Sequence, residues 1–400
     1  MLYKKEINKA IIKNEIIQKK FRKTFLDKTS IKLIEKFIIE NELICYGGTA
    51  INNILPEKHK FYDYELEIPD YDFYSYNALY HCKKLAKILS NKYENVEAKS
   101  SLHKGTYKIF VNFLPLVDVT QITDYEYNIL LSNVIIINNI YHCSLRFLKM
   151  SLYSELSRPL GDISRWNKNY NRLELLHKLN IKNSNKLLIY IIPDDKIKIY
   201  IKIVKLCIKH KLVLMGDFGL SWYKDYLNKD IKKILNNTKL KQIFILHYDI
   251  EFILKLFKGF DIKKYPKKGE LSQDIYEIKI DDYSIAYIFI NDTCQSYNKI
   301  NNFCIASIDT ILSVYYSIEY NNTNINMNNI FLYCDELEKI HKSNKTNVLR
   351  RFYMPCIGIQ DTIEDIIHTR NNTYKKYKND KNNIKYKELF FKYYPKTKKK

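Results

Sequence analysis

Apolar residues recur at helical spacing along the N-terminal segment of this chain. They return every three or four positions there, which predicts helix over residues 4–40. Further along, short apolar runs alternate with glycine and with polar turn residues, and such runs favour strands. The residues that set the helical pattern are Ile11, Ile12, Ile16, Ile17 and Phe21.

The first predicted strand, over residues 43–46, ends in a motif suited to phosphate binding. It breaks into Gly47, Gly48 and Thr49, a loop that can present backbone N–H groups to a phosphate. Ordinary turns between a strand and a helix use the same residue types. The motif taken alone therefore leaves both interpretations open.

Acidic residues mark two further predicted strands. Asp70 and Asp72 are one residue apart, so a strand turns both carboxylates to the same face, where together they attract a cation. Asp118 is the single acid in the apolar run 114–119, where an unpaired charge costs several kcal/mol. A shared metal ion would compensate all three. The alternatives are a solvated turn or N-cap for the pair and a salt bridge for Asp118.

The order of these elements resembles the nucleotidyltransferase superfamily of DNA polymerase β. More closely, it is similar to the poly(A) polymerase catalytic subunit of large cytoplasmic DNA viruses, of the mimivirus and poxvirus kind. The resemblance runs from about Ile44 to Arg172, with a longer gap than usual between Gly48 and Asp70. It is carried by Gly47, Gly48, Thr49, Ala50, Asn52, residues 69–74, His103, Thr106, Tyr107 and Asp118, and then by residues 146–149, residues 156–162, Arg165, Trp166, Lys168 and Arg172.

The resemblance implies a mixed α+β nucleotidyltransferase fold and a polynucleotide adenylyltransferase. Such an enzyme adds AMP from ATP to the 3′-end of RNA without a template, as in mRNA polyadenylation. Asp70, Asp72 and Asp118 would be its catalytic residues and metal ligands. Hard oxygen ligands without a neighbouring cysteine or histidine cluster favour Mg²⁺, with Mn²⁺ as a substitute.

Cationic side chains after the third acid would complete a triphosphate site. Gly47, Gly48 and Thr49 would cradle the β- and γ-phosphates, and Lys149, Arg165 and Lys168 would supply positive charge. Arg146 shares a helical face with Lys149, Arg172 continues the later set, and Trp166 is available for stacking. In a chain so rich in lysine, a solvated surface charge is the alternative for each of these cations.

The second half of the chain begins a similar pattern again. Residues 211–220 resemble 44–50, residues 244–249 resemble the strand with Asp70, and residues 283–292 resemble the strand with Asp118. We therefore expect a degenerate nucleotidyltransferase-like domain that has lost the glycine motif and one of the paired acids. An unrelated α/β domain is the alternative. The expected domains are residues 1–185, residues 186–345, and a C-terminal helical and Lys-rich segment over residues 346–400.

Composition sets the expected partners and compartment. A chain of 400 residues with 46% hydrophobic content can bury more than one core, and a net charge of +22 favours a polyanionic partner such as RNA. Codon bias of an A/T-rich genome also produces many lysines, so the charge only supports the argument from the site. The eight cysteines form no CxxC pair and predict reduced core thiols. We expect a protein of the host cytoplasm and the virion, without a secretion signal or membrane segment, and a homodimer on general grounds.

Other functions use the same residues. A CCA-adding enzyme, a terminal uridylyltransferase and a synthase of 2′–5′ or cyclic oligonucleotides share such a site. A non-catalytic RNA-binding processivity subunit and a structural viral protein belong to other classes. The lysines after residue 375 predict either an RNA-binding arm or a solvated helix end followed by disorder.

Overall fold

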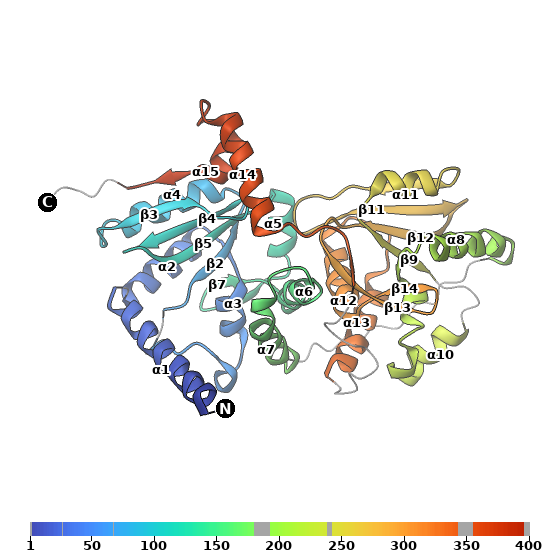
Figure 1. Cartoon of the computed structure of the whole chain (residues 1–400), viewed down its shortest axis with the longest axis horizontal. Coiled ribbons are helices and arrows are strands. Elements are labelled where there is room, and N and C mark those ends of the chain that lie inside the picture. The colour runs from blue at the N-terminus through green and yellow to red at the C-terminus, as the bar shows by residue number, and fades with distance from the viewer. Residues whose placement is uncertain are drawn as a thin grey trace. The chain divides into compact units, whose positions relative to one another are not determined.

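The computed structural model of the protein describes residues 2–25, 27–66, 68–179, 193–237, 242–342 and 355–395. Two compact units divide the chain (Figure 1). Unit 1 comprises Met1–Ser144 with Asp361–Lys400, and unit 2 comprises Leu145–Gln360. Each unit contains one eight-stranded sheet of mixed strand directions with helices packed on it.

Unit 1 is built on a sheet whose strands follow the order β16-β3-β4-β5-β2-β1-β7-β6. Two N-terminal helices precede the sheet, and its last strand comes from the C-terminal segment. The elements are α1 (Leu2–Phe25), α2 (Lys28–Glu40), β1 (Ile44–Tyr46), α3 (Gly47–Ile54), β2 (Tyr71–Ser75), α4 (Ala78–Leu89), β3 (Val96–Ser100), β4 (Thr106–Val111), β5 (Leu114–Gln121), α5 (Asp124–Leu131), β6 (Ile135–Ile137), β7 (Ile140–His142), α14 (Ile363–Tyr377), α15 (Ile384–Phe390) and β16 (Lys392–Tyr393).

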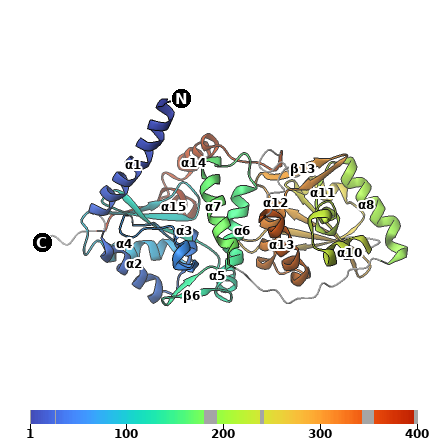
Figure 2. The same cartoon turned by 90° about the horizontal axis from the view of Figure 1, so that it is seen from below.

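The predicted N-terminal helix is present but divided in two. Asp27 caps the second helix, because its carboxylate accepts the backbone N–H groups of Thr29 and Ser30. Only α2 packs into the core, through Ile34 and Phe37. The large apolar side chains of α1 between Tyr3 and Phe21 are exposed, and Figure 2 shows this helix projecting from the rest of unit 1.

The Lys-rich segment after residue 375 is folded as far as residue 395. Strand β16 pairs antiparallel with β3, with Lys392 opposite Lys99, and Phe391 is only 8% exposed. Neither a free arm nor a solvated helix end describes this part of the segment. Residues 396–400 of the predicted tail lie outside the described residues.

Unit 2 begins with two helices and continues with a second sheet, of order β10-β11-β12-β9-β8-β14-β13-β15. Helix α12 packs against both α6 and α13. The elements are α6 (Leu145–Leu156), α7 (Trp166–His177), α8 (Ile197–Lys209), β8 (Val213–Met215), α9 (Gly216–Leu220), α10 (Lys229–Asn237), β9 (Ile243–His247), α11 (Ile250–Leu256), β10 (Asp261–Tyr265), β11 (Asp274–Ile280), β12 (Tyr283–Ile290), β13 (Gln295–Ile300), β14 (Phe303–Ala306), α12 (Ile308–Ser317), α13 (Met327–Lys342) and β15 (Cys356–Ile357).

The two sheets repeat one topology, as the sequence predicted. Seven neighbouring strands of each sheet follow the same order. This order is β3-β4-β5-β2-β1-β7-β6 in the first sheet and β10-β11-β12-β9-β8-β14-β13 in the second. The pairing senses also agree. Strands β1 and β2 are antiparallel like β8 and β9, while β2 and β5 are parallel like β9 and β12.

The boundaries of the compact units differ from the repeat. Unit 2 starts at Leu145, inside the first copy of the pattern, because α6 makes its main packing contact with α12. Domain limits drawn along the repeat, with breaks near 185 and 345, therefore stay a prediction. Both of these breaks fall among residues 180–192 and 343–354, which lie outside the described part of the chain.

The cysteines correct one expectation. Cys294 and Cys356 form a disulfide that joins the start of β13 to β15. The six other cysteines are buried free thiols, as predicted. Among the described residues, no helix combines the length and apolar character that crossing a bilayer requires.

Candidate active site

Two of the predicted catalytic acids lie side by side in unit 1. Strands β2 and β5 run parallel, and their register pairs Asp72 directly with Asp118, which puts both side chains on the same face of the sheet. The charges of both acids affect the pKa of the Tyr46 phenol. Burial, then the charge of Asp72 and more weakly that of Asp118, raise the pKa of Tyr46 far above its ordinary value.

Gly47 allows the backbone to approach this pair closely. It begins α3 with a φ of +69°, a conformation that favours glycine. A Cβ at this position would lie 2.4 Å from Oδ2 of Asp72, so the carboxylate packs directly against the glycine backbone. The Gly-Gly-Thr motif is therefore a strand-to-helix turn that also borders the acidic site.

Thr49 and Asn52 act on the backbone around the acids. The hydroxyl of Thr49 is fully buried and donates to the carbonyl oxygen of Asp70 at 2.7 Å. The Thr49 side chain thus positions the backbone of Asp70, and the contact of Thr49 with phosphates stays a prediction. The side-chain oxygen of Asn52 accepts the backbone N–H groups of Phe61 and Tyr62, which fixes the longer connection between α3 and β2.

Asp118 also has a cationic partner that the sequence analysis did not name. Lys108 lies opposite Asp118 across β4 and β5, and its Nζ is 2.5 Å from Oδ2 of Asp118. The two side chains are 33% and 19% exposed, so solvent weakens the ion pair. The alternative considered for Asp118, a salt bridge, is thus present in this structure. Extending the hairpin register back from the turn at residues 112–113 would have paired Lys108 with Val117, because the register shifts between Ile109 and Phe110.

The acids fit a magnesium site in part. Asp72 and Asp118 offer carboxylate oxygens on one face, which are ligands that Mg²⁺ prefers. Asp70 is exposed and comes immediately before β2. Within the described ranges, no group of three acidic, histidine or cysteine side chains is gathered closely enough to hold a metal ion. The joint ligand role of the three acids stays a prediction.

The cations predicted to bind the triphosphate belong to unit 2. Lys149 is buried, and its Nζ lies 2.6 Å from Oε2 of Glu338, so the structure does not support Lys149 as a triphosphate ligand. The guanidinium of Arg146 lies 3.7 Å from the ring centre of Phe331. Trp166 donates its indole N–H to the carbonyl oxygen of Glu155, and Arg172 is buried. Arg165 and Lys168 are exposed, and their role stays a prediction.

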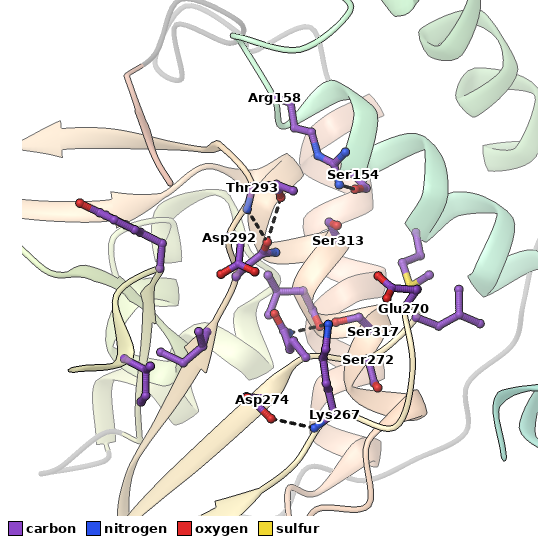
Figure 3. A pocket seen from close by; sticks show the side chains of 18 residues that line it. Ser154, Arg158, Lys267, Glu270, Ser272, Asp274, Asp292, Thr293, Ser313 and Ser317 are labelled. Atoms are coloured by element: carbon purple, nitrogen blue, oxygen red, sulfur yellow. Dashed lines mark hydrogen bonds between the residues drawn. The ribbon is translucent and has the colours of Figure 1, made fainter. Parts of the chain in front are cut away.

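A separate cavity of about 480 Å³ lies within unit 2 (Figure 3). Arg158 lines it and donates to the hydroxyl of Ser154 at 2.8 Å, while its Nε has no hydrogen-bond partner. Burial lowers the pKa of this guanidinium. Both signs of charge line the cavity, since Glu270 and Asp292 face it as well. The sequence analysis missed this cavity because five segments distant in the sequence form it.

The second sheet places other residues where the first has its acids. Phe244 pairs with Met215 across β9 and β8, as Asp72 pairs with Tyr46 across β2 and β1. Tyr287 pairs with Phe244, as Asp118 pairs with Asp72. Counting back from Phe244, the counterpart of Asp70 is Gln242. The prediction that the second copy lost one of the paired acids is wrong, because these positions retain none. The acids singled out by the sequence, Asp249 and Asp292, lie beyond the ends of β9 and β12.

Comparison with known proteins connects the site to a family. Residues 32–162 match the family model of the poly(A) polymerase catalytic subunit. This stretch of the chain is therefore similar to that family. It contains Gly47 and all three acids, so the resemblance predicted from the sequence is confirmed.

Relatives of this family come from large DNA viruses. A protein of Acanthamoeba polyphaga mimivirus, provisionally named a poly(A) polymerase catalytic subunit, is 32% identical over 190 residues, which cover 46% of this chain and 32% of the relative. A protein of African swine fever virus (strain Badajoz 1971 Vero-adapted) with the same provisional name is 29% identical over 114 residues, 28% of this chain and 24% of the relative. The match thus spans about a third or less of these relatives' length.

The fold is shared over nearly the whole chain. The crystal structure of the Megavirus polyadenylate synthase superposes with a TM-score of 0.76 at 21% identity, covering 98% of this chain and 84% of that one. The chain therefore has a nucleotidyltransferase-type fold, as predicted.

Proposed function

We propose that this chain adds AMP from ATP to the 3′-end of RNA without a template. The observation that carries the proposal is the pairing of Asp72 with Asp118 on adjacent parallel strands beside Gly47, within the stretch that matches the family. The preference for ATP over other nucleotides rests on the family alone.

Asp70, Asp72 and Asp118 would hold Mg²⁺, or Mn²⁺ in its place. A pair of such ions bound by carboxylates activates the attacking 3′-hydroxyl and stabilises the charge on the leaving pyrophosphate. The chain's own contribution is positioning. Thr49 fixes the backbone at Asp70, and Gly47 holds the chain against the Asp72 carboxylate.

Lys108 would keep the acidic site compact when no cation is bound. Its ammonium offsets part of the repulsion between Asp72 and Asp118, and it is partly exposed, so it can move away at small cost. Arg165 and Lys168 are exposed cations that would attract the triphosphate, with the N–H groups of Gly47 and Gly48 as further phosphate contacts.

The proposed partners follow from this chemistry. ATP and an RNA 3′-end are the substrates, and the net charge of +22 supports RNA binding. A homodimer would extend the RNA-binding surface. The viral relatives support a viral protein that works in the host cytoplasm and is carried in the virion.

A primer-extension assay tests the proposal. The purified chain is incubated with a labelled RNA primer, Mg²⁺ and each of the four nucleoside triphosphates in turn. We expect a ladder of products with ATP alone. A uridylate ladder would indicate a terminal uridylyltransferase, and limited addition of CTP and ATP would indicate a CCA-adding enzyme, and either result contradicts the proposal. Analysis of the linkage separates a 3′-tail from 2′–5′ products.

A non-catalytic RNA-binding subunit is the second candidate. The ion pair between Lys108 and Asp118 favours it, because this pair neutralises an acid without any metal. Such a subunit would bind RNA and incorporate no nucleotide, and removing the acids would leave its binding unchanged.

A further inference from the structure

A cavity of about 460 Å³ lies within unit 2 at the counterpart of the candidate active site. Gly216 has the φ of +69° seen at Gly47, and it follows β8 as Gly47 follows β1. The positions of the three acids, now Gln242, Phe244 and Tyr287, all border this cavity. The remaining lining residues belong to α9, β12, α12, the segment before α13, and α13 itself. They are Asp217, Ser284, Tyr315, Asn324, Ile325, Asn326, Asn329, Ile330 and Tyr333.

Neither a triphosphate nor a divalent cation suits this cavity. The backbone N–H of Gly216 donates to the hydroxyl of Tyr315 at 3.0 Å, so the counterpart of the phosphate loop is already occupied by a side chain. Phe244 and Tyr287 cannot act as carboxylate ligands. The lining residues include no lysine or arginine, and the carboxylate of Asp217 repels an anion.

A flat, uncharged ring suits the cavity much better. Phe244, Tyr315 and Tyr333 supply aromatic surface, and Ile325 and Ile330 supply aliphatic surface, all from buried side chains. Aromatic faces of this kind stack on nucleobases. The volume lies within the range of small-ligand sites.

The polar groups of the cavity favour a ring that donates hydrogen bonds. Asp217 is held in place because its carboxylate accepts the hydroxyl of Tyr333 at 2.6 Å and the backbone N–H of Gln242 at 3.3 Å. A carboxylate can accept about four hydrogen bonds in all, and it donates none. A ligand with an amino group is therefore favoured over one with a carbonyl at the same place. Asn324 and Asn326 can both donate and accept at other edges of the ring.

We propose that this cavity binds a nucleobase with an exocyclic amino group without using the phosphates, and the choice of adenine among such bases rests on the proposed function. The degenerate copy has thus kept a place for a base and lost the machinery for the triphosphate. The occupant is an adenosine moiety, either free or as an unpaired nucleotide of an adenylate strand. No acid of unit 1 takes part in this binding.

Photolabelling of the full chain with an azido-substituted adenosine tests the proposal. We expect the label in the segment 324–333, and we expect adenosine to compete for it. Inosine carries a carbonyl in place of the amino group and should compete at least about tenfold more weakly, because a carboxylate cannot donate to it. A short oligoadenylate that competes more strongly than adenosine would identify RNA as the source, and the opposite order would identify the free nucleoside.

Variants of the chain test which residues bind the base. Asp217→Asn should lower labelling about tenfold, whereas Asp225→Asn, an exposed acid of the same unit, should leave it unchanged. Asn326→Ala provides a second variant if Asp217→Asn lowers the yield of folded protein. Equal competition by inosine, or label found only outside residues 216–333, would overturn the proposal. A chain that labels as expected but incorporates no AMP would contradict the proposed polymerase and support this site.

Discussion

The two sheets of this protein share strand order and pairing but differ at the positions proposed to be catalytic. In the first sheet, Asp72 and Asp118 are partly exposed and border a glycine turn. In the second, Phe244 and Tyr287 occupy the paired positions and are at most 2% exposed. The paired positions are thus acidic and partly exposed in one copy, and aromatic and buried in the other. The fold itself requires no acid at these places.

The residue that faces the second of these positions from the neighbouring strand also differs in charge between the two sheets. Lys108 on β4 faces Asp118, whereas Glu277 on β11 faces Tyr287. Glu277 is fully buried. Burial opposes its ionisation, but hydrogen bonds from Ser284 and Tyr265 outweigh this effect and keep the pKa of Glu277 below its ordinary value. A solvated ion pair in the first sheet is therefore replaced by a buried hydrogen-bond network in the second.

Removing acids from the first sheet should give the largest effect. The double variant Asp70→Ala with Asp72→Ala should lower AMP incorporation at least about 10³-fold, because both carboxylates are needed to hold cations at the reaction site. Primer extension measures the loss, and circular dichroism checks the fold. Asp282→Ala removes an exposed acid from the second sheet as the matched control. Equal activity of the double variant and the control would refute the catalytic assignment.

The buried pair between Lys149 and Glu338 should govern stability instead of catalysis. In the second copy, the counterpart of Lys149 is Leu312 on α12. Tyr141 and Cys304 are equivalent strand residues, and Lys149 and Leu312 come eight residues after them. Lys149→Met leaves the Glu338 carboxylate buried without its cation, so we expect the free energy of unfolding to fall by about 3–5 kcal/mol.

Urea denaturation measures this change, and adding Glu338→Gln to Lys149→Met should restore a large part of it. A Lys149→Met chain of unchanged stability but raised KM for ATP would contradict this explanation. It would instead support the triphosphate role predicted from the sequence.

Alanine substitution at the two glycine turns should destabilise the fold to different extents. At Gly47 an added Cβ meets the mobile end of the Asp72 side chain, whereas at Gly216 it meets the backbone oxygen of Gln242 at 2.6 Å. Alanine also disfavours the positive φ by about 1–2 kcal/mol at each position. Gly216→Ala should therefore lower the melting temperature more than Gly47→Ala.

Activity should respond to these glycines in the reverse order. Gly47→Ala displaces the Asp72 carboxylate, and we expect AMP incorporation per folded molecule to fall at least about tenfold. Full activity in Gly47→Ala would show that the close approach of backbone and carboxylate has no catalytic importance.

Lys108 should give the smallest effect. Lys108→Met should change stability by less than about 1 kcal/mol, because both members of its ion pair are partly exposed. The Mg²⁺ concentration that gives half-maximal incorporation should fall, since no ammonium then competes for Asp118. Lys99→Met, which removes a similarly exposed ion pair on β3, is the control. An increase in the required Mg²⁺ would contradict this interpretation.

Local patterns predicted much of the first sheet. The period-two spacing of Asp70 and Asp72, the glycine turn and the repeated topology were all readable from residue order. Partners distant in the chain were not. Lys149 has helical spacing typical of a solvated cation, and only the packing of α6 and α13 in unit 2 brings it to Glu338. The register of β9 was also misjudged, because acids just beyond a strand end resemble acids within it.

The path of the chain makes unit 1 discontinuous. Its outermost strand, Lys392–Tyr393, is separated in the sequence from its partner β3 by all of unit 2. During translation, the hydrogen-bonding edge of β3 therefore stays unprotected until residues 392–393 have been made. An exposed strand edge is a site for aggregation. Termination of the chain before residue 392 would consequently release a first sheet whose β3 edge is open to association.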